Sequence, residues 1–162
     1  MNNKELISYA IKARENSYSP YSNYRVGAAL LTKSGKVYLG ANIENCAYGP
    51  SNCAERSAIF SAMSNGEREF VKLAIVGSSN DICYPCGVCR QVIAELLPNA
   101  EIICAENESH FVVKTPQELL PFAFSKSDVD CVKKDWKINW NILLKIINNF
   151  ISIIFNFFII II

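Results

Sequence analysis

The main part of this 162-residue sequence lacks an excess of charge of either sign. Residues 1–130 carry 12 Lys or Arg and 14 Asp or Glu, a balance of −2, whereas residues 131–162 carry four Lys and one Asp. A protein that binds nucleic acid usually presents a basic face, because contacts to phosphate supply most of its affinity. The charge balance therefore favours a small-molecule substrate and argues against a nucleic-acid partner.

The sequence also lacks an apolar secretory leader, since residues 1–15 show a helical pattern of mixed charge instead. The seven cysteines are an odd number, which together with the missing leader predicts a reduced, cytoplasmic protein rather than a disulfide framework. Histidine occurs once, and His110 lies between polar residues where we expect a turn. We therefore do not expect His110 to bind a metal.

The length and the apolar content of 51% allow one domain with a substantial core. We assign this domain to residues 1–130. Residues 131–162 differ in composition, because Lys, Asn, Ile and Phe dominate there. This segment is a separate hydrophobic tail.

Two interpretations of the tail remain open. Residues 142–162 contain a single charge, Lys145, and a run of about 20 apolar residues can span a bilayer. Trp136 and Trp140 suit a membrane interface, so the tail could associate with a membrane, although its asparagines weaken this interpretation. Alternatively, the tail is a translated, non-native extension beyond the natural end of the domain.

The apolar pattern predicts alternating strands and helices within residues 1–130. Gly66 is well placed to end a helix in a left-handed conformation. This alternation indicates an α/β fold, in which helices cover both faces of a sheet. We expect helices at 3–15, 53–65 and 86–97, a helical turn at 116–120, and strands at 24–32, 37–41, 71–77, 101–106 and 111–114.

Three cysteines stand where two of these helices are expected to start. Cys53 begins one helix, and Cys86 and Cys89 form a C-x-x-C pair at the start of the other. Helix N-termini lower thiol pKa values and favour the metal-binding thiolate. Three protein ligands with a fourth position left for water are typical of catalytic zinc.

Two charged residues follow Cys53 directly. Glu55 is well placed to carry protons to and from a water at the metal. Three thiolates leave Zn²⁺ with a net negative charge, and a guanidinium at Arg56 would offset it by hydrogen bonding to the sulfurs. Glu55 is therefore a candidate catalytic residue, with Arg56 as support for the ligands.

Each motif taken alone has other interpretations. A C-x-x-C pair could be a redox pair or half of a structural zinc site. The spacing of Cys83, Cys86 and Cys89 also resembles that of iron–sulfur ligands. The combination with Cys53 and Glu55 favours catalytic zinc, and we expect Cys83 to be a loop thiol near the site rather than a ligand.

These motifs resemble the signatures of the small, homotetrameric, three-cysteine cytidine deaminases. The resemblance covers about residues 1–128 in order, and it implies a three-layer α/β/α sandwich with a five-stranded mixed sheet. It also implies that Cys53, Cys86 and Cys89 hold Zn²⁺. The matching segments are residues 21–22, 26–30, 42–45, Tyr48, 53–56, 85–91 and 118–121.

The resemblance implies zinc-dependent hydrolytic deamination of cytidine and deoxycytidine to uridine and deoxyuridine in pyrimidine salvage. Water would attack C4 of the cytosine ring, and Glu55 would carry the protons. Asn42 and Glu44 match positions that bind the ribose hydroxyls. Tyr24 and Ala54 match positions beside the base, and the resemblance makes Tyr48 a further candidate for substrate binding.

The same resemblance implies that a neighbouring subunit closes each pocket with an aromatic side chain. Phe124 is the best match for it, but Phe122 stands where glycine is common and could serve instead. Tyr24 replaces a frequent phenylalanine, and Tyr84 stands where a small hydroxyl residue is more usual.

Two rival functions remain. The chain could deaminate another cytosine-bearing nucleoside on the same scaffold. It could instead be a non-catalytic, zinc-stabilised binding domain, but such a domain would not need Glu55.

Overall fold

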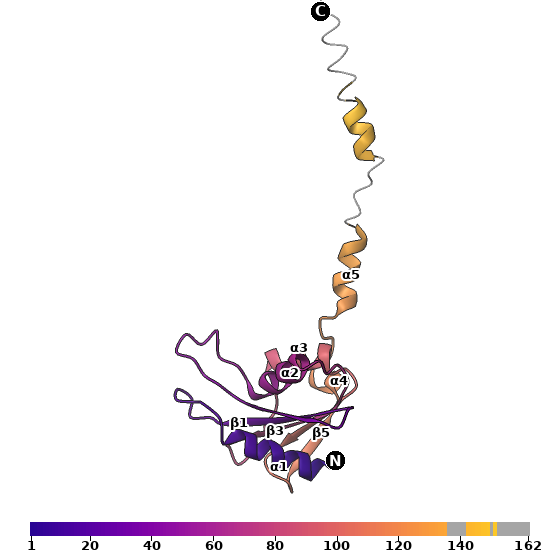
Figure 1. Cartoon of the computed structure of the whole chain (residues 1–162). Helices are drawn as coiled ribbons and strands as arrows, with labels where there is room; N and C mark the ends of the chain where they lie inside the picture. Colours follow the sequence, from indigo (N-terminus) through magenta and orange to yellow (C-terminus); the bar gives the residue numbers. More distant parts are fainter. Residues whose placement is uncertain (136–141, 150, 152–162) are drawn as a thin grey trace, which may run out of the picture. The chain divides into compact units, whose positions relative to one another are not determined.

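A five-stranded mixed sheet lies at the centre of the unit Met1–Phe124. The computed structural model describes residues 1–135, 142–149 and 151 (Figure 1). The strand order is β2-β1-β3-β4-β5; β3 and β4 are parallel, and the other neighbouring pairs are antiparallel. The strands are β1 (Val26–Thr32), β2 (Val37–Ala41), β3 (Phe70–Gly77), β4 (Glu101–Ala105) and β5 (Phe111–Lys114).

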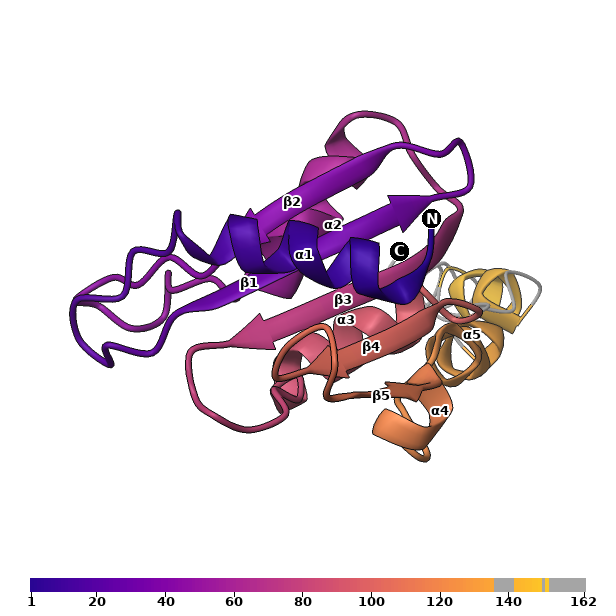
Figure 2. The same ribbon diagram turned by 90° about the horizontal axis from the view of Figure 1, so that it is seen from below.

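Helices cover both faces of this sheet. One face packs against α1 (Asn3–Arg14), and the opposite face packs against α2 (Ala54–Ser64) and α3 (Gly87–Leu96), as Figure 2 shows. The short helix α4 (Pro116–Leu119) follows β5. The predicted α/β/α sandwich with a five-stranded mixed sheet is confirmed.

The alternation of side chains along the strands supplies two separate cores. On the α1 side, Leu6 and Ile7 pack with Ala29 and Ile103. On the other side, the buried cluster joins α2 and α3 to the sheet through residues that include Ala28, Leu30, Ile59, Ile75 and Ile93. The central strands are apolar at successive positions because both of their faces are covered.

Gly40 in β2 lets the start of α2 approach the sheet closely. A Cβ atom at this position would lie 2.2 Å from the carbonyl oxygen of Ala54 and 2.5 Å from the backbone nitrogen of Ala58. Only glycine fits between the strand and the helix backbone here. This contact holds the first turn of α2 at a fixed depth on the sheet.

Four predicted element starts need correction, and one of them is β3, which begins at Phe70, one residue before the predicted start. The strand expected from Tyr24 begins at Val26, because the backbone N–H groups of Tyr24 and Arg25 donate to the hydroxyls of Ser22 and Ser78 instead of to a strand. The two cysteine-bearing helices begin at Ala54 and Gly87, one residue later than expected.

Cys53 and Cys86 are thus N-cap residues with extended backbone. Neither residue uses its side chain to cap its helix. Gly66 has the predicted left-handed conformation, with φ of 86°. The cap positions leave both sulfurs available to a ligand.

Residues 125–162 form a second unit. It contains α5 (Lys126–Asp135), which the sequence pattern did not indicate, and a helical segment at 142–149. Within the described ranges, no helix is both long and apolar enough to cross a membrane. Most of the stretch that suggested an anchor, and both tryptophans, lie outside the described residues, so the tail and the domain boundary at residue 130 stay predictions.

Candidate metal centre

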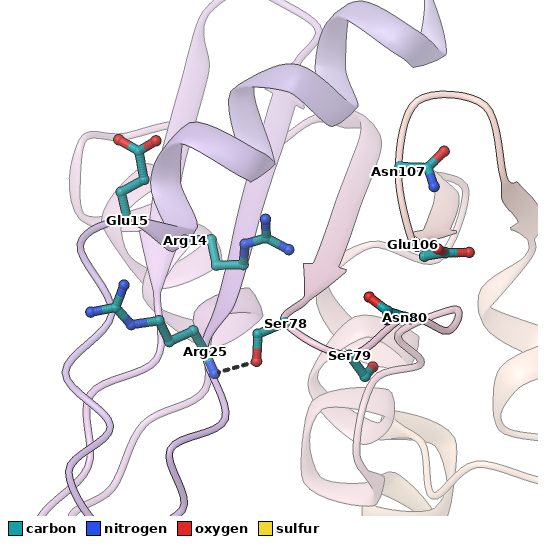
Figure 3. Close-up of a pocket in the computed structure, with 8 residues that line it drawn as sticks. All are labelled: Arg14, Glu15, Arg25, Ser78, Ser79, Asn80, Glu106 and Asn107. Atoms are coloured by element: carbon teal, nitrogen blue, oxygen red, sulfur yellow. Dashed lines mark hydrogen bonds between the residues drawn. The ribbon is translucent and has the colours of Figure 1, made fainter.

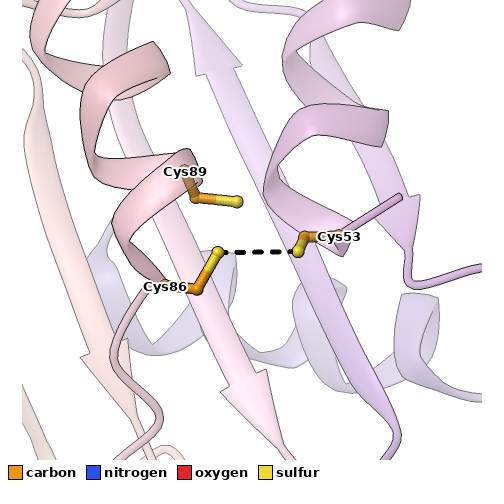
Figure 4. Close-up of side chains that lie close together, drawn as sticks. All are labelled: Cys53, Cys86 and Cys89. Atoms are coloured by element: carbon orange, nitrogen blue, oxygen red, sulfur yellow. Dashed lines mark hydrogen bonds between the residues drawn. The ribbon is translucent and has the colours of Figure 1, made fainter. Parts of the chain in front are cut away.

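The sulfur atoms of Cys53, Cys86 and Cys89 converge at the N-terminal ends of α2 and α3 (Figure 4). All three sulfurs lie within 4.8 Å of one another, and those of Cys53 and Cys86 are 3.7 Å apart. A tetrahedral zinc with Zn–S bonds of about 2.3 Å places its sulfurs roughly 3.8 Å apart. The cluster therefore fits zinc with little adjustment.

The three cysteines differ in exposure, and this difference gives the cluster an open side. Cys89 is buried, Cys53 is partly buried and Cys86 is exposed. A closed structural site would use four protein ligands. Within the described part of the chain, the cluster offers three, so its donor set matches that of a catalytic zinc site.

Cys53 and Cys89 are joined by a hydrogen bond in which Cys89 keeps the proton. The pKa of Cys53 falls to about 5, because the Cys89 thiol donates to its sulfur and Arg56 stabilises the thiolate, against the opposing effect of burial. The pKa of Cys89 is raised, because its proton is held by the Cys53 sulfur and because burial disfavours its thiolate. Cys53 is thus ready to bind a metal, whereas Cys89 must release its proton on binding.

Arg56 lies against the sulfurs of the cluster. Its Nη2 donates to the Cys53 sulfur at 3.7 Å and to the carbonyl oxygen of Ser51 at 3.3 Å. Burial acts to lower its pKa, but the thiols of Cys53 and Cys89 outweigh this effect and raise it. In the described part of the chain its Nε is buried with no hydrogen-bond partner. A cation in this position offsets the charge of the thiolates.

Glu55 occupies the first turn of α2 and is only 4% exposed. Burial raises the pKa of its carboxyl to about 7, and the negative charge of Cys53 acts in the same direction. A carboxyl whose pKa lies near neutral pH can accept a proton and later return it. Glu55 therefore combines the position and the acidity that a proton carrier needs.

Asn42 and Glu44 hold the neighbouring loop in place. The side-chain oxygen of Asn42 accepts from the backbone N–H of Val26 at 2.8 Å, and its amide nitrogen donates to the carbonyl oxygen of Tyr24 at 2.8 Å. Glu44 accepts from Ser22, and this hydrogen bond lowers the pKa of its carboxyl. Both residues are thus structurally engaged, while the ribose contacts implied by the resemblance stay predictions.

The remaining candidate residues lie on different parts of this region. Ala54 is fully buried at the first position of α2. Tyr48 is 75% exposed, has a positive φ of 40° and meets the ring of Tyr21 edge to face, with centroids 6.3 Å apart. Phe122 is fully exposed and Phe124 is 63% exposed. The substrate contacts that the resemblance implies for these residues stay predictions.

Cys83 and His110 are not members of the sulfur cluster among the described residues. Cys83 is buried and accepts a hydrogen bond from the Tyr24 hydroxyl. His110 pairs with Glu106 at 2.6 Å on the surface. The sequence carries no signal for the contact between Cys83 and Tyr24, which are 59 positions apart.

Comparison with known proteins agrees with this geometry. Residues 1–106 match the family model described as the cytidine and deoxycytidylate deaminase zinc-binding region. The chain belongs to the cytidine and deoxycytidylate deaminase family. The predicted resemblance is confirmed, and Zn²⁺ is the metal that the three-sulfur cluster of this family member fits.

Individual members of the deaminase family cover most of the chain. A cytidine deaminase of Halalkalibacterium halodurans is 47% identical over 131 residues, which are 80% of this chain and 99% of that protein. A crystal structure of cytidine deaminase from Burkholderia pseudomallei aligns with a TM-score of 0.74 and 47% identity, over 76% of this chain and 100% of that one. A more distant relative is a blasticidin-S deaminase of Bacillus cereus, 31% identical over 76% of this chain and 92% of its own length.

Proposed function

We propose that this chain is a zinc-dependent hydrolase that converts cytidine and deoxycytidine to uridine and deoxyuridine, with release of ammonia, in pyrimidine salvage. The observation that carries the proposal is the burial of Glu55, with its pKa raised to about 7, beside three converging cysteine sulfurs. The names of the relatives support the same substrate class.

Cys53, Cys86 and Cys89 would hold the zinc, which when bound would supply Lewis acidity that makes water nucleophilic at neutral pH. The carboxylate of Glu55 would take a proton from the attacking water and deliver it to the ring nitrogen N3 of the base, as a new C4–O bond forms. It then assists the departure of ammonia in the same way. Because its carboxyl is buried, proton exchange with bulk solvent does not compete with this transfer.

Asn42 and Glu44 bind the ribose, and Tyr24 and Ala54 lie beside the base. Arg56 donates to the Cys53 sulfur, and by offsetting the thiolate charge it would keep a bound metal acidic enough to activate water. A polynucleotide substrate is disfavoured because the domain has no basic surplus.

The active assembly is a homotetramer whose sites are completed across subunits. Exposed aromatic side chains at Tyr48, Phe122 and Phe124 support this proposal, since large apolar groups on a surface mark contact sites. The free thiols among the described cysteines suit the reducing cytoplasm, which is the compartment that we propose.

The test uses the full-length chain. Purified protein should contain one zinc per chain and should release ammonia from cytidine, followed as loss of absorbance. Glu55→Gln should keep its zinc while kcat falls about 100-fold to 10,000-fold, the usual share of a general acid–base group. Glu95→Gln, an exposed change in α3, is the matched control and should keep full activity. A zinc-loaded wild type that releases no ammonia from cytidine or deoxycytidine would overturn the proposal.

A second candidate substrate is another cytosine-bearing nucleoside, because one relative is a blasticidin-S deaminase. Comparing kcat/KM for cytidine and blasticidin S separates the two. We expect cytidine to be preferred, since Asn42 and Glu44 match ribose-binding positions. A clearly higher kcat/KM for blasticidin S than for cytidine would show that the antibiotic is the preferred substrate.

A further inference from the structure

The backbone of Tyr24 is tied to the loop that carries the proposed ribose-binding residues. Its N–H donates to the hydroxyl of Ser22 at 3.0 Å, and its carbonyl oxygen accepts from the Asn42 amide at 2.8 Å. Ser22 also donates to the carboxylate of Glu44. One end of the tyrosine is therefore fixed by the same residues that we propose hold the sugar.

The hydroxyl end of Tyr24 reaches the loop between β3 and α3. It donates to the sulfur of Cys83 at 3.6 Å and lies 3.4 Å from the hydroxyl of Ser79. A Cβ atom on Gly77 would lie only 2.2 Å from the Tyr24 hydroxyl oxygen. Gly77, Ser79 and Cys83 thus form a slot that accepts a tyrosine hydroxyl and leaves no room for a larger residue at position 77.

The slot itself is held firmly. The backbone N–H of Arg25 donates to Ser78 at 3.0 Å, as Figure 3 shows at the edge of a cavity of about 460 Å³. Cys83 is 6% exposed, and its backbone N–H donates to the carbonyl oxygen of Ala105, the last residue of β4, at 3.3 Å. The acceptor for the Tyr24 hydroxyl is therefore anchored to the sheet.

The slot also adjoins the metal centre. Cys83 stands three residues before Cys86 in the chain. Burial raises the pKa of its thiol, and the nearby charges of Glu55 and Cys53 add to the effect. Tyr24 thus connects the loop of the proposed ribose-binding residues to the loop that leads into the proposed zinc ligands.

We infer that Cys83 is a positioning residue, which by accepting the Tyr24 hydroxyl holds the tyrosine ring in place against the cytosine base. The inference rests on the proposed function. It predicts that Cys83 acts on substrate binding through Tyr24 and not on the metal or on the chemical step.

The test compares steady-state kinetics of full-length, zinc-loaded variants. Cys83→Val removes the acceptor at similar volume, Tyr24→Phe removes the donor, and a double variant removes both. Cys83→Ser restores an acceptor. Cys104→Val is the matched control, because it makes the same change at a buried position of β4 in the same core cluster as Cys83.

Each single loss should raise KM for cytidine about twofold to fivefold, as expected for one weak hydrogen bond to sulfur, with kcat and zinc content unchanged. The double variant should be no worse than Tyr24→Phe alone, because that change already removes the donor of the bond to Cys83. Cys83→Ser and Cys104→Val should stay near the wild type. An unchanged KM in Cys83→Val, additive effects in the double variant, or loss of zinc would each overturn the inference.

A second readout does not depend on turnover. In protein labelled with ¹³C-tyrosine, the ring signal of Tyr24, identified by its loss in Tyr24→Phe, should shift in Cys83→Val and not in Cys104→Val. An unshifted signal counts against the inference. A wild type that fails to deaminate cytidine would overturn the proposed function, whereas an active wild type with an unaltered Cys83→Val would overturn only the role of Cys83.

Discussion

Glu55 is a charged residue buried in the first turn of α2, next to the cysteine cluster. The carboxyl is buried at the start of α2, where burial and the Cys53 charge raise its pKa from the usual 4.5 to about 7. Such an environment lowers stability and is seldom retained unless a function needs it. The raised pKa of Glu55 should make the free energy of unfolding depend on pH.

In protein stripped of metal by a chelator, the stability difference between wild type and Glu55→Gln should depend on pH. Between pH 4.5 and 7 the folded state holds a proton that the unfolded state has released. The contribution of Glu55 is therefore fully present below pH 4.5 and is lost as pH rises through 7. Denaturant unfolding should show the wild type losing about 2 kcal/mol relative to Glu55→Gln between pH 5 and pH 8.

The comparison with Glu55→Gln isolates this carboxyl. The depressed pKa of Cys53 has the opposite effect, since its stabilisation is lost as pH falls through about 5. Both proteins keep Cys53, so its effect largely cancels in the difference. Parallel stability curves for the two proteins would show that Glu55 is not buried as an acid of raised pKa.

At the scale of elements, the site depends on how two helix starts are set against the sheet. Cys53 and Glu55 are carried by α2, and Cys86 and Cys89 by α3. The depth of α2 is fixed by the close approach of its first turn to Gly40. A small displacement of α2 would move Cys53 and Glu55, the proposed ligand and the proposed proton carrier, together.

Gly40→Ala should therefore damage the metal centre from a distance. The new methyl group would overlap backbone atoms of Ala54 and Ala58, which cannot move without shifting the helix. We expect a loss of about 1–3 kcal/mol in unfolding free energy, together with less zinc per chain. Denaturant unfolding and metal analysis measure the two effects.

Gly49→Ala is the matched control for this substitution. A methyl group there would lie 3.6 Å from its nearest neighbour, the carbonyl oxygen of Ala47, which is an ordinary contact. It should keep its zinc and most of its stability. Equal behaviour of the two variants would mean that α2 does not rest on Gly40 as described.

At the scale of the whole molecule, the cluster has an exposed member, Cys86, and the unit Met1–Phe124 carries bare aromatic side chains. Phe122 is fully exposed with φ of 57°, a conformation that costs a non-glycine residue free energy. Such features are readily explained if another subunit covers them. They underlie the proposal that the site is completed in a homotetramer.

Co-expression of two inactive variants tests shared sites. Glu55→Gln lacks the proton carrier, and Phe124→Ala lacks the proposed closing ring, so each alone should be nearly inactive. In mixed tetramers, a subunit with Glu55 can receive Phe124 from its neighbour. Random assembly of equal amounts should restore about one quarter of wild-type activity per site.

The experiment also decides between the two phenylalanines. The same co-expression can be done with Glu55→Gln and Phe122→Ala. If Phe124 is the closing residue, Phe122→Ala is active by itself, so mixing it with Glu55→Gln should give no activity beyond that of the separate variants. Sharing of sites between subunits would be contradicted if neither mixture, Glu55→Gln with Phe124→Ala or Glu55→Gln with Phe122→Ala, were more active than the sum of its two variants measured separately.

Much of the site could be predicted from the sequence, because its parts are local. The C-x-x-C spacing puts Cys86 and Cys89 one helical turn apart, and Glu55 follows Cys53 within the same turn. Apolar periodicity likewise located the strands, since strand and helix repeats differ. Element starts were less accurate, because side-chain hydroxyls and N-cap geometry decided them.

The sequence by itself determined the order of elements and predicted the candidate ligand types and the candidate proton carrier, since these depend on residue identity and short-range spacing. Only the tertiary structure decided that Cys53 and Cys86 lie 3.7 Å apart, that Glu55 is buried and that Cys83 accepts the Tyr24 hydroxyl. The two contacts join residues 33 and 59 positions apart through the packing of helices and loops on the sheet. Their distances and pKa shifts follow from packing and desolvation, which no local pattern encodes.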